Sequence, residues 1–330
     1  MQHFRTVFDI EPSQNKINHT TKILSLGSCF SENIGEKLLY YKLPVIINPF
    51  GILYNPESVA NSIDILLENK QFSDADLFEY NSVWNSFYHH SRFSDIDKQH
   101  CLQKINISIN NAANHLKKTR FLLITLGTAW VYKYKKNGQI VSNCHKIPAK
   151  EFLRFKLSTE HIVKRFSNTF DTLLQQNTDI NIVFTVSPVR HLKDGAHENQ
   201  LSKATLLLAI DELTKKYSKI NYFPSYELVM DDLRDYRFYT DDMIHPSQQA
   251  VEYIWNKFKN VFINEQTNNF FKQIEDINRA LQHRSFQPKS EAHRKFLKKT
   301  LEKINTLEEQ LKGISFDEEK NILLRQFNNT

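Results

Sequence analysis

Short apolar runs alternate with stretches of helical spacing along the first 262 residues. Five runs have the length and continuous apolar character of buried strands, at 22–26, 44–48, 120–126, 180–186 and 220–223. Helical stretches separate or follow them, at 32–41, from 55 onward, and at 99–118, 159–176, 198–217 and 246–262. Continuous apolar strands that alternate with helices are typical of a parallel sheet covered on both faces. The pattern therefore predicts an α/β fold with a five-stranded parallel sheet.

Two details of this part of the chain refine the prediction. Asn55 followed by Pro56 predicts a helix start, because asparagine caps helices well and proline suits the first helical position. The segment 72–97 has no clear period and is predicted to be a long ordered loop that carries Trp84, His89 and His90. Long loops in compact domains are often functional.

After Phe262 the pattern becomes purely helical. Apolar residues recur at 270, 274, 277 and 281, and again at 297, 301, 304, 307 and 311. Gln287-Pro288 breaks the first helix, Ser290 can cap the second, and Gly313 can end it. We therefore predict an α/β domain over 1–262 and a C-terminal helical hairpin over 263–330. The hairpin would pack on the domain or on a partner, so it is also a surface for oligomer formation.

Composition narrows the class of protein. Three cysteines in 330 residues do not make a disulfide framework. No signal peptide or membrane-spanning apolar run is visible, so we expect a cytoplasmic protein without a transmembrane segment. The net charge of +6 comes from 43 basic and 37 acidic residues, which is too dilute for a nucleic-acid site. We expect no nucleic-acid partner, no cofactor and no metal.

Candidate chemistry lies where the predicted strands end. In a parallel α/β sheet the site lies at the carboxyl ends of the strands. Here these ends carry Gly27-Ser28-Cys29, Asn48-Pro49-Phe50-Gly51, Gly127-Thr128 and Ser187-Pro188, and the loop after the fifth strand reaches Asp242 and His245. Small and polar residues thus occupy the positions at which a site is expected.

Cys29 is a candidate nucleophile, because a thiol at a helix N-terminus has a lowered pKa. Asp242, three residues before His245, can bind one ring nitrogen and leave the other to act as a base. Each residue alone also has a structural interpretation, since a cysteine at a strand end is usually a small core residue. Only the combination predicts catalysis.

Several segments resemble a known family. These are Leu26-Gly27-Ser28-Cys29-Phe30-Ser31, Trp84 with residues 86–94 (SFYHHSRFS), residues 143–148 (NCHKIP), residues 187–191 (SPVRH) and residues 233–239 (LRDYRFY). They resemble the GSCFA family over about residues 4–262, with Ser31 where the name has alanine. That family is similar to the SGNH (GDSL-type) hydrolase superfamily. The resemblance implies a three-layer, flavodoxin-like sheet and an esterase-like or acyl-transfer site.

The resemblance also implies roles for individual residues. The serine of the superfamily's Gly-Asp-Ser-Leu motif falls on Cys29, with Ser28 as the alternative nucleophile. The closing Asp-x-x-His falls on Asp242 and His245, and Asp241 is a second candidate for the acid. An oxyanion hole would use the backbone N–H groups of Cys29 and Gly51.

One departure from the superfamily pattern concerns the oxyanion hole. An asparagine usually lies two residues after the third-strand glycine, which is Gly127 here, but this chain has Ala129. Asn143 or His145 are candidates to replace it. The remaining candidates for the pocket wall are Trp84, Trp130, His89, His90 and Arg190. A metal site of His89, His145 and Cys144 has a ligand spacing that matches no familiar site.

Three functions stay open from the sequence. The first is an acyl hydrolase or acyltransferase that acts on a small-molecule or acyl-carrying substrate through a Cys29 acyl-enzyme, or through Ser28 as a serine esterase. The second is a catalytically degenerate binding module, motivated by Ala129. The third is an interaction protein that binds nucleic acid or an anionic membrane through its basic tail, including residues 293–295 and 298–299.

Overall fold

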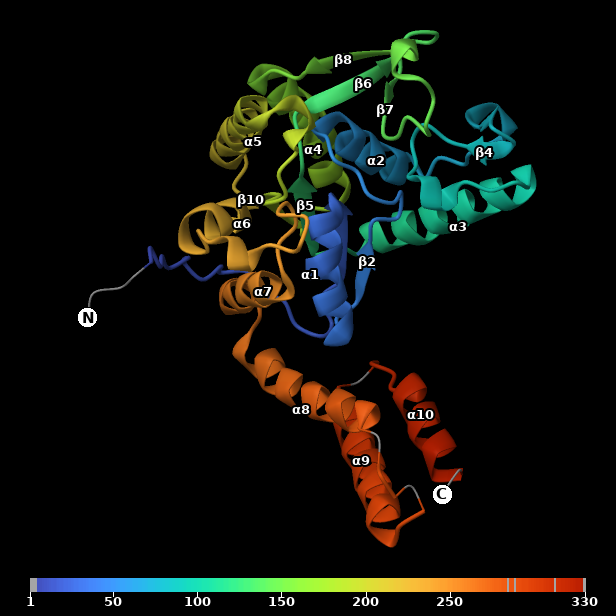
Figure 1. The fold of residues 1–330 in the computed structure, drawn as a ribbon, viewed down its shortest axis with the longest axis vertical. Coiled ribbons are helices and arrows are strands. Elements are labelled where there is room, and N and C mark those ends of the chain that lie inside the picture. The colour runs from blue at the N-terminus through green and yellow to red at the C-terminus, as the bar shows by residue number, and fades with distance from the viewer. Residues whose placement is uncertain (1–4, 284, 288, 312, 329–330) are drawn as a thin grey trace.

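A parallel sheet of five strands forms the centre of the molecule (Figure 1). The computed structural model describes residues 5–283, 285–287, 289–311 and 313–328. The sheet comprises β1 (Ile23–Gly27), β2 (Val45–Ile47), β5 (Phe121–Leu126), β9 (Asn181–Val186) and β10 (Ile220–Tyr222). Its order is β10-β9-β5-β1-β2, and every neighbouring pair is parallel. This is the flavodoxin-like order, which confirms the predicted fold class.

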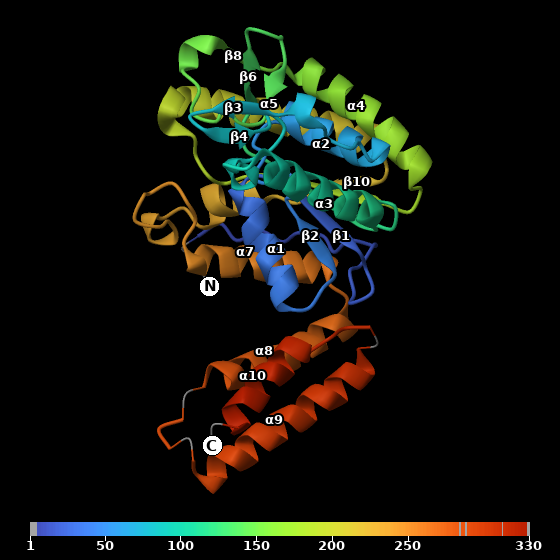
Figure 2. The same cartoon turned by 90° about the vertical axis from the view of Figure 1, so that its right-hand side faces the viewer.

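Helices cover both faces of this sheet. The helices of the α/β part are α1 (Cys29–Tyr40), α2 (Pro56–Glu68), α3 (Lys98–Leu116), α4 (Thr159–Gln176), α5 (Ala196–Lys216), the short α6 (Ser225–Glu227) and α7 (Gln248–Phe262). Figure 2 shows α2, α3, α4 and α5 on one side of the sheet and α1 and α7 on the other. The result is a three-layer arrangement.

Alternate residues of each strand pack into the two apolar layers on opposite faces of the sheet. Leu24 and Leu26 of β1 pack with the α2–α5 layer, whereas Ile23 packs with α1 and α7. In β5, Leu122 and Ile124 face the first layer, and Phe121 and Leu123 face the second. Because both faces are covered, these strands are apolar at most positions, which explains the nearly continuous apolar runs in the sequence.

Two small antiparallel sheets lie in segments for which the apolar pattern predicted no strands. β3 (Phe78–Tyr80) pairs with β4 (Val83–Asn85), so the segment predicted as a long loop contains a hairpin. β6 (Trp130–Tyr134) pairs with β7 (Ile140–Val141) and β8 (Phe152–Lys156). Since β6 follows β5 directly, this second sheet starts at the carboxyl edge of the main sheet (Figure 1).

Local capping fixes where several helices begin. The Asn55 side chain accepts from Ser58 N at 2.9 Å, with Pro56 at the first helical position, as predicted. The Ser290 side chain accepts from His293 N at 3.2 Å, which confirms the second predicted cap. The break predicted at Pro288 lies outside the described residues.

The C-terminal part contains three helices, where the sequence predicted two. They are α8 (Glu265–Gln282), α9 (Glu291–Gln310) and α10 (Asp317–Asn328). α8 joins the α/β part through Phe271, whose ring stacks on Tyr41 at 4.0 Å between centroids. Figure 2 shows the three helices grouped beyond α7. In the part of the chain that the structure describes, no helix is long and apolar enough to cross a membrane.

Candidate active site

The end of β1 runs unusually close to the end of β5. Gly27 has φ of +137°, and a Cβ there would lie 2.1 Å from Thr125 O, so only glycine fits. The next N–H, of Ser28, donates to Thr125 O at 3.0 Å. This turn delivers the chain into α1, which starts at Cys29 on the carboxyl edge of the sheet.

Ser28 and Cys29 differ sharply in accessibility. Ser28 is 1% exposed, and its Oγ is buried without a hydrogen-bond partner among the described residues. Cys29 is half-buried and is the first residue of α1. A substrate can therefore reach the thiol more easily than the hydroxyl.

The prediction that the helix N-terminus lowers the pKa of the Cys29 thiol is wrong. Burial raises the pKa of the thiol, and the Glu32 carboxylate raises it further. The N–H groups of Cys29 and Phe30 and the charge of Lys203 act in the opposite direction but do not outweigh burial. A resting thiol in this site is therefore protonated and needs a base, or a stronger positive charge, to become a nucleophile.

Asp242 and His245 form the acid–histidine pair that the spacing predicts. His245 Nδ1 donates to Asp242 Oδ2 at 2.6 Å, and the backbone N–H groups of Ile244 and His245 donate to Asp242 Oδ1, both at 2.9 Å. These bonds, together with one from Thr240 Oγ1, hold the pKa of Asp242 well below its usual range. An ionised carboxylate on Nδ1 orients the ring and leaves Nε2 to accept a proton. The predicted alternative acid, Asp241, is not needed for this pair.

The loop after β9 contacts the loop that carries this pair. Arg190 Nη2 donates to Met243 O at 2.6 Å, and the guanidinium lies 4.8 Å from the Tyr239 ring centroid. The charge of His245 contributes to lowering the pKa of His191, which shows that the two rings are near each other. Burial lowers the pKa of His191 to about 4, so His191 is neutral. The β9 loop therefore links the Asp242–His245 pair to the sheet edge.

Asn48 holds the loop after β2 in place through several hydrogen bonds. One of them uses the Gly51 N–H, for which the predicted role in the oxyanion hole is therefore wrong. Its Oδ1 accepts from Gly27 N at 2.9 Å, and its Nδ2 donates to Ser31 Oγ at 3.0 Å. Gly51 N donates to Asn48 O at 2.7 Å. The Gly51 N–H was predicted to be an oxyanion donor, but it is already used inside this turn. Arg92 adds a further bond to Asn48 O.

Lys203 is a buried cation at the same edge. It lies on α5 and is 1% exposed. Its Nζ donates to Gly127 O and to Ser187 O, both at 2.7 Å, so it joins the ends of β5 and β9. Burial lowers the pKa of Lys203 to about 7, whereas the charge of Cys29 raises it.

A cavity of about 370 Å³ adjoins the end of β5. Its wall includes Trp130, a predicted pocket residue, and Asn143, the predicted oxyanion donor, together with Cys144, Tyr54 and His191. Burial raises the pKa of Tyr54, and the charge of Cys29 contributes to this shift. Tyr54 therefore lines this cavity and is near enough to Cys29 to feel its charge.

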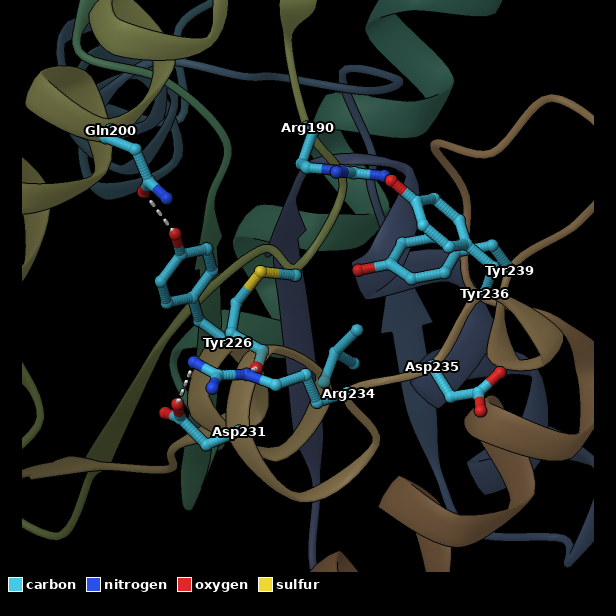
Figure 3. A pocket seen from close by; sticks show the side chains of 10 residues that line it. Arg190, Gln200, Tyr226, Asp231, Arg234, Asp235, Tyr236 and Tyr239 are labelled. Carbon is cyan, nitrogen blue, oxygen red and sulfur yellow. Dashed lines mark hydrogen bonds and ion pairs between the residues drawn. The ribbon is translucent and has the colours of Figure 1, made fainter.

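A larger cavity of about 510 Å³ lies on the other side of Arg190. Figure 3 shows Tyr236 and Tyr239 projecting side by side toward Arg190, with Tyr226 and Arg234 on the opposite side of the space. Arg234 is paired with Asp231 at 3.6 Å, whereas Arg190 Nε is buried and has no partner among the described residues. Arg190 thus borders both this cavity and the Asp242–His245 loop.

Comparison with known proteins identifies the family. The sequence profile of the GSCFA family matches residues 22–258. The chain belongs to the GSCFA family. A second profile, described as the GSCFA domain protein, C-terminal domain, matches residues 274–329. No match to the chain was found among curated proteins.

Several solved structures are similar to this GSCFA chain. One of them is described as the crystal structure of a carbohydrate esterase family 3 from Talaromyces cellulolyticus. The TM-score is 0.35 and the sequence identity is 8%, over 78% of this chain and 99% of that chain. The fold class of the GSCFA chain therefore rests on its own strand order.

Four residues that were predicted to line the pocket or, for His145, to complete the oxyanion hole have structural roles in this GSCFA protein. His89 is 0% exposed and stacks on Phe50 at 5.1 Å between centroids, so it cannot meet a substrate. His145 is buried, and its Nε2 donates to Ser86 O at 2.8 Å. His90 caps a short turn by accepting from the Arg92 N–H.

Trp84 is the fourth of these residues. It lies in β4, where Cys101 Sγ donates to its carbonyl oxygen and Lys98 lies 4.6 Å from its ring centroid. These contacts fix the hairpin on α3, which explains the tryptophan without a substrate. Within the described residues, no cluster of three or more histidine, cysteine, aspartate or glutamate side chains could hold a metal ion.

Sequence reasoning missed Tyr54 and Lys203, and it assigned no role to Asn48 or His191. Asn48 was placed at the predicted sheet edge and His191 in a family-like segment, so their positions were indicated but not their contacts. Lys203 carried a subtler signal, because it lies three, seven and ten residues before Leu206, Ile210 and Leu213. That spacing puts a lysine on the apolar stripe of a helix.

Proposed function

We propose that this GSCFA protein is an acyl hydrolase or acyltransferase that acts on esters or thioesters through Cys29, His245 and Asp242. The observation that carries the proposal is the Asp242–His245 pair. Its carboxylate holds Nδ1 at 2.6 Å and is itself fixed by backbone N–H groups. Such a pair serves to accept a proton at Nε2 and return it. Cys29 at the start of α1 is the nucleophile type at the same sheet edge.

Accessibility favours Cys29 over Ser28 as the nucleophile. Ser28 is 1% exposed and its hydroxyl is buried, so a carbonyl carbon could not approach it without local movement. The Cys29 thiol is half-buried and has two backbone N–H groups directed toward its sulfur. Those N–H groups also suit the negative charge of a tetrahedral intermediate.

The proposed reaction has two steps. In the first, His245 Nε2 takes the thiol proton and the sulfur attacks the carbonyl carbon of the substrate. The bond to the alcohol or thiol leaving group then breaks, and the leaving group takes the proton from His245. In the second, water or an acceptor hydroxyl gives its proton to His245 and attacks the Cys29 thioester. The acyl product leaves, and the thiol regains its proton.

The adjoining cavity of about 370 Å³ is the proposed acyl site. Ala129 offers no side-chain donor, and its N–H donates to Ser202 Oγ at 2.8 Å. His145 is unsuited to replace the missing donor, because its Nε2 is bound to Ser86 O. Asn143 lies in the cavity wall and remains the proposed side-chain donor to the substrate.

The decisive experiment is mass spectrometry after incubation with an activated ester and a panel of acyl-thioesters. We expect an acyl adduct on the peptide that carries Cys29, lost in Cys29→Ala and accumulating more slowly in His245→Ala. Cys101→Ala is the control, because Cys101 is a free thiol outside the wall of this cavity and should not affect the adduct. An adduct on Ser28 would replace the thiol mechanism by a serine esterase.

A second candidate function is a binding module that has lost catalysis. The raised pKa of Cys29 and the alanine at position 129 favour it. It predicts that small esters or thioesters bind without turnover and that Cys29→Ala binds them as well as the wild type. Turnover above the Cys29→Ala background would exclude it.

A further inference from the structure

The cavity of about 510 Å³ beside Arg190 lies outside the proposed acyl site. Part of its wall is an unusual helix, because five residues of π-helix, Leu228–Asp232, follow α6 directly. Such helical segments are rare and are frequent at functional sites. The volume also falls in the range of small-molecule sites, about 300–1,000 Å³. The cavity is therefore a candidate site for a ligand group of its own.

One wall of this cavity is continuous with the loop that carries the proposed base. Tyr239 in the wall pairs with Pro246, the residue after His245, in an antiparallel bridge. The N–H of Thr240, the residue after Tyr239, donates to His245 O at 2.8 Å. A ligand in the cavity would therefore lie beside the backbone that positions the proposed catalytic histidine.

Adjacent residues of the loop after β9 line this cavity and the proposed acyl site. Arg190 lines the cavity of about 510 Å³, whereas His191 lines the cavity of about 370 Å³. Arg190 Nη2 also donates to the carbonyl oxygen of Met243, which lies between Asp242 and His245 in the sequence, at 2.6 Å. The two cavities thus flank one loop, and that loop is bonded to the proposed catalytic pair. A substrate of acyl transfer has two halves, and this arrangement suits one half in each cavity.

The carboxylates in the wall already have cationic partners. Asp231 Oδ1 lies 3.6 Å from Arg234 Nη2. Asp235 Oδ2 lies 2.9 Å from Arg237 Nη2, and its Oδ1 accepts from the Arg237 N–H at 2.9 Å. Each pair compensates its own charge, so neither carboxylate is left to compensate another cation in the wall.

Arg190 is the cation in this wall that lacks a carboxylate partner. It bonds the Met243 carbonyl oxygen and lies against the Tyr239 ring, and it forms no ion pair within the described residues. Tyr236 and Tyr239 project toward it (Figure 3), and their hydroxyl groups have no hydrogen-bond partner among the described residues. An arginine stays charged at any ordinary pH, and its guanidinium binds carboxylates and phosphates through parallel N–H groups. The cavity thus offers one unpaired positive charge and two free hydroxyl groups to an anion.

We propose that the cavity of about 510 Å³ binds the alcohol or thiol half of the substrate, and that this half carries a carboxylate or phosphate group that pairs with Arg190. The inference rests on the proposed function, which defines the two halves. It adds the charge and the location of the half that leaves with, or accepts, the acyl group. The rings of Tyr236 and Tyr239 supply apolar surface for the carbon skeleton of that half, and their hydroxyl groups supply donors for its anion.

The test is isothermal titration calorimetry of the full chain with three probes that share one ring: phenylacetate, phenyl phosphate and the neutral phenylacetamide. We expect one of the two anions to bind at least about tenfold more tightly than the amide, and the tighter anion identifies the group as carboxylate or phosphate. In Arg190→Gln this anion should bind about tenfold or more weakly, because a hydrogen bond between two charged groups is lost, and the amide should bind as before.

Arg279→Gln is the matched control, because Arg279 is an exposed arginine of α8 that pairs with Asp276 and lies outside the wall of this cavity. It should bind all three probes like the wild type. Three results would each overturn the proposal: no binding of either anion at millimolar concentration, equal affinity for the anions and the amide, or unchanged anion affinity in Arg190→Gln.

A second variant covers the case in which Arg190→Gln does not fold. Asp231→Asn releases Arg234 from its ion pair in the wall of the same cavity, and 52% of the Asp231 side chain is exposed, so the fold should tolerate the change. A second free cation should strengthen anion binding by about threefold or more. No gain in anion affinity would overturn the proposal.

The binding measurements do not use acyl transfer, so they separate this proposal from the proposed function. Anion binding that depends on Arg190, without turnover of any ester, would support the anion site and reject the enzyme. Comparison of phenyl acetate with carboxyphenyl acetate tests the two together. Turnover of both esters with equal kcat/KM, and without anion binding, would support the enzyme and reject the anion site.

Discussion

Two groups of histidines in this molecule look alike in the sequence and differ in almost every physical respect. His245 is half-exposed, with 48% of its side chain accessible, and an ionised carboxylate holds its Nδ1. His89 is 0% exposed and bonds Ser86 Oγ at 3.0 Å, and His145 beside it bonds Ser86 O. Burial lowers the pKa of His89 to about 3. The first histidine can exchange protons, and the second two are kept neutral.

The difference shows that the partner and the exposure of a histidine, more than its motif, determine what it can do. All three histidines lie in segments that resemble family motifs or the Asp-x-x-His pattern. Only His245 combines a carboxylate partner with contact to solvent. The ring nitrogens of His89 and His145 instead form hydrogen bonds to Ser86 inside a buried loop, which is the commoner role of a buried polar group.

The largest effect that separates the two groups is expected for His245→Gln. Loss of the general base should lower acyl transfer by about 10³-fold. The free energy of unfolding should change by less than about 0.5 kcal/mol, because the side chain is half-exposed. Turnover with the best thioester and urea denaturation of the same samples check both parts. Activity within tenfold of the wild type would remove His245 from the mechanism.

The opposite behaviour is expected for His89→Ala. The ring packs against Phe50, Phe72 and Phe93, so its removal leaves a cavity in an aromatic cluster. We expect a loss of about 3 kcal/mol in the free energy of unfolding, by analogy with other large-to-small core changes. His90→Ala is the matched control, since it removes only a turn cap and should cost about 1 kcal/mol or less. Equal losses in the two variants would contradict the structural role of His89.

Local patterns in the sequence predicted the parallel sheet and most helices, whereas the flavodoxin-like arrangement of the sheet was implied only by the family resemblance. The strands of the main sheet are buried on both faces, so their apolar runs are strong signals, and Asn55 and Ser290 mark helix starts through side-chain bonds to nearby N–H groups. The smaller sheet of β6, β7 and β8 was missed. Its strands mix aromatic and charged residues, as in Trp130–Tyr134, and one face is open to solvent.

The candidate site was predicted only in part, because its remaining features depend on tertiary structure. Asp242 and His245 are three residues apart, so their pairing is local. The raised pKa of Cys29 was not predicted, because it comes from burial by distant segments. Lys203 reaches Gly127 across 76 residues, and no local rule connects them.

Measurements of folding stability at acid pH should show the effect of the buried histidine group. The folded-state pKa of His89 is about 3, below the ordinary value of 6.5. Between these values the unfolded chain binds a proton that the folded chain does not, so stability falls as the pH is lowered through this window. His89 should contribute a loss of about 1.4 kcal/mol per pH unit. Urea unfolding of the wild type and His89→Phe at pH 6.5, 5.5 and 4.5 measures the difference in slope, and parallel slopes would contradict a buried neutral His89.

The smallest effect is expected for Thr240→Val, which tests how finely the exposed pair is positioned. Thr240 Oγ1 donates to Asp242 Oδ1 at 2.8 Å, and this bond helps to lower the pKa of the carboxyl group. Its loss should slow acyl transfer by about two- to tenfold, the range for one hydrogen bond. Thr306→Val, whose hydroxyl bonds only the backbone of α9, should leave the rate unchanged. If the two valine variants behave alike, the backbone bonds alone position Asp242.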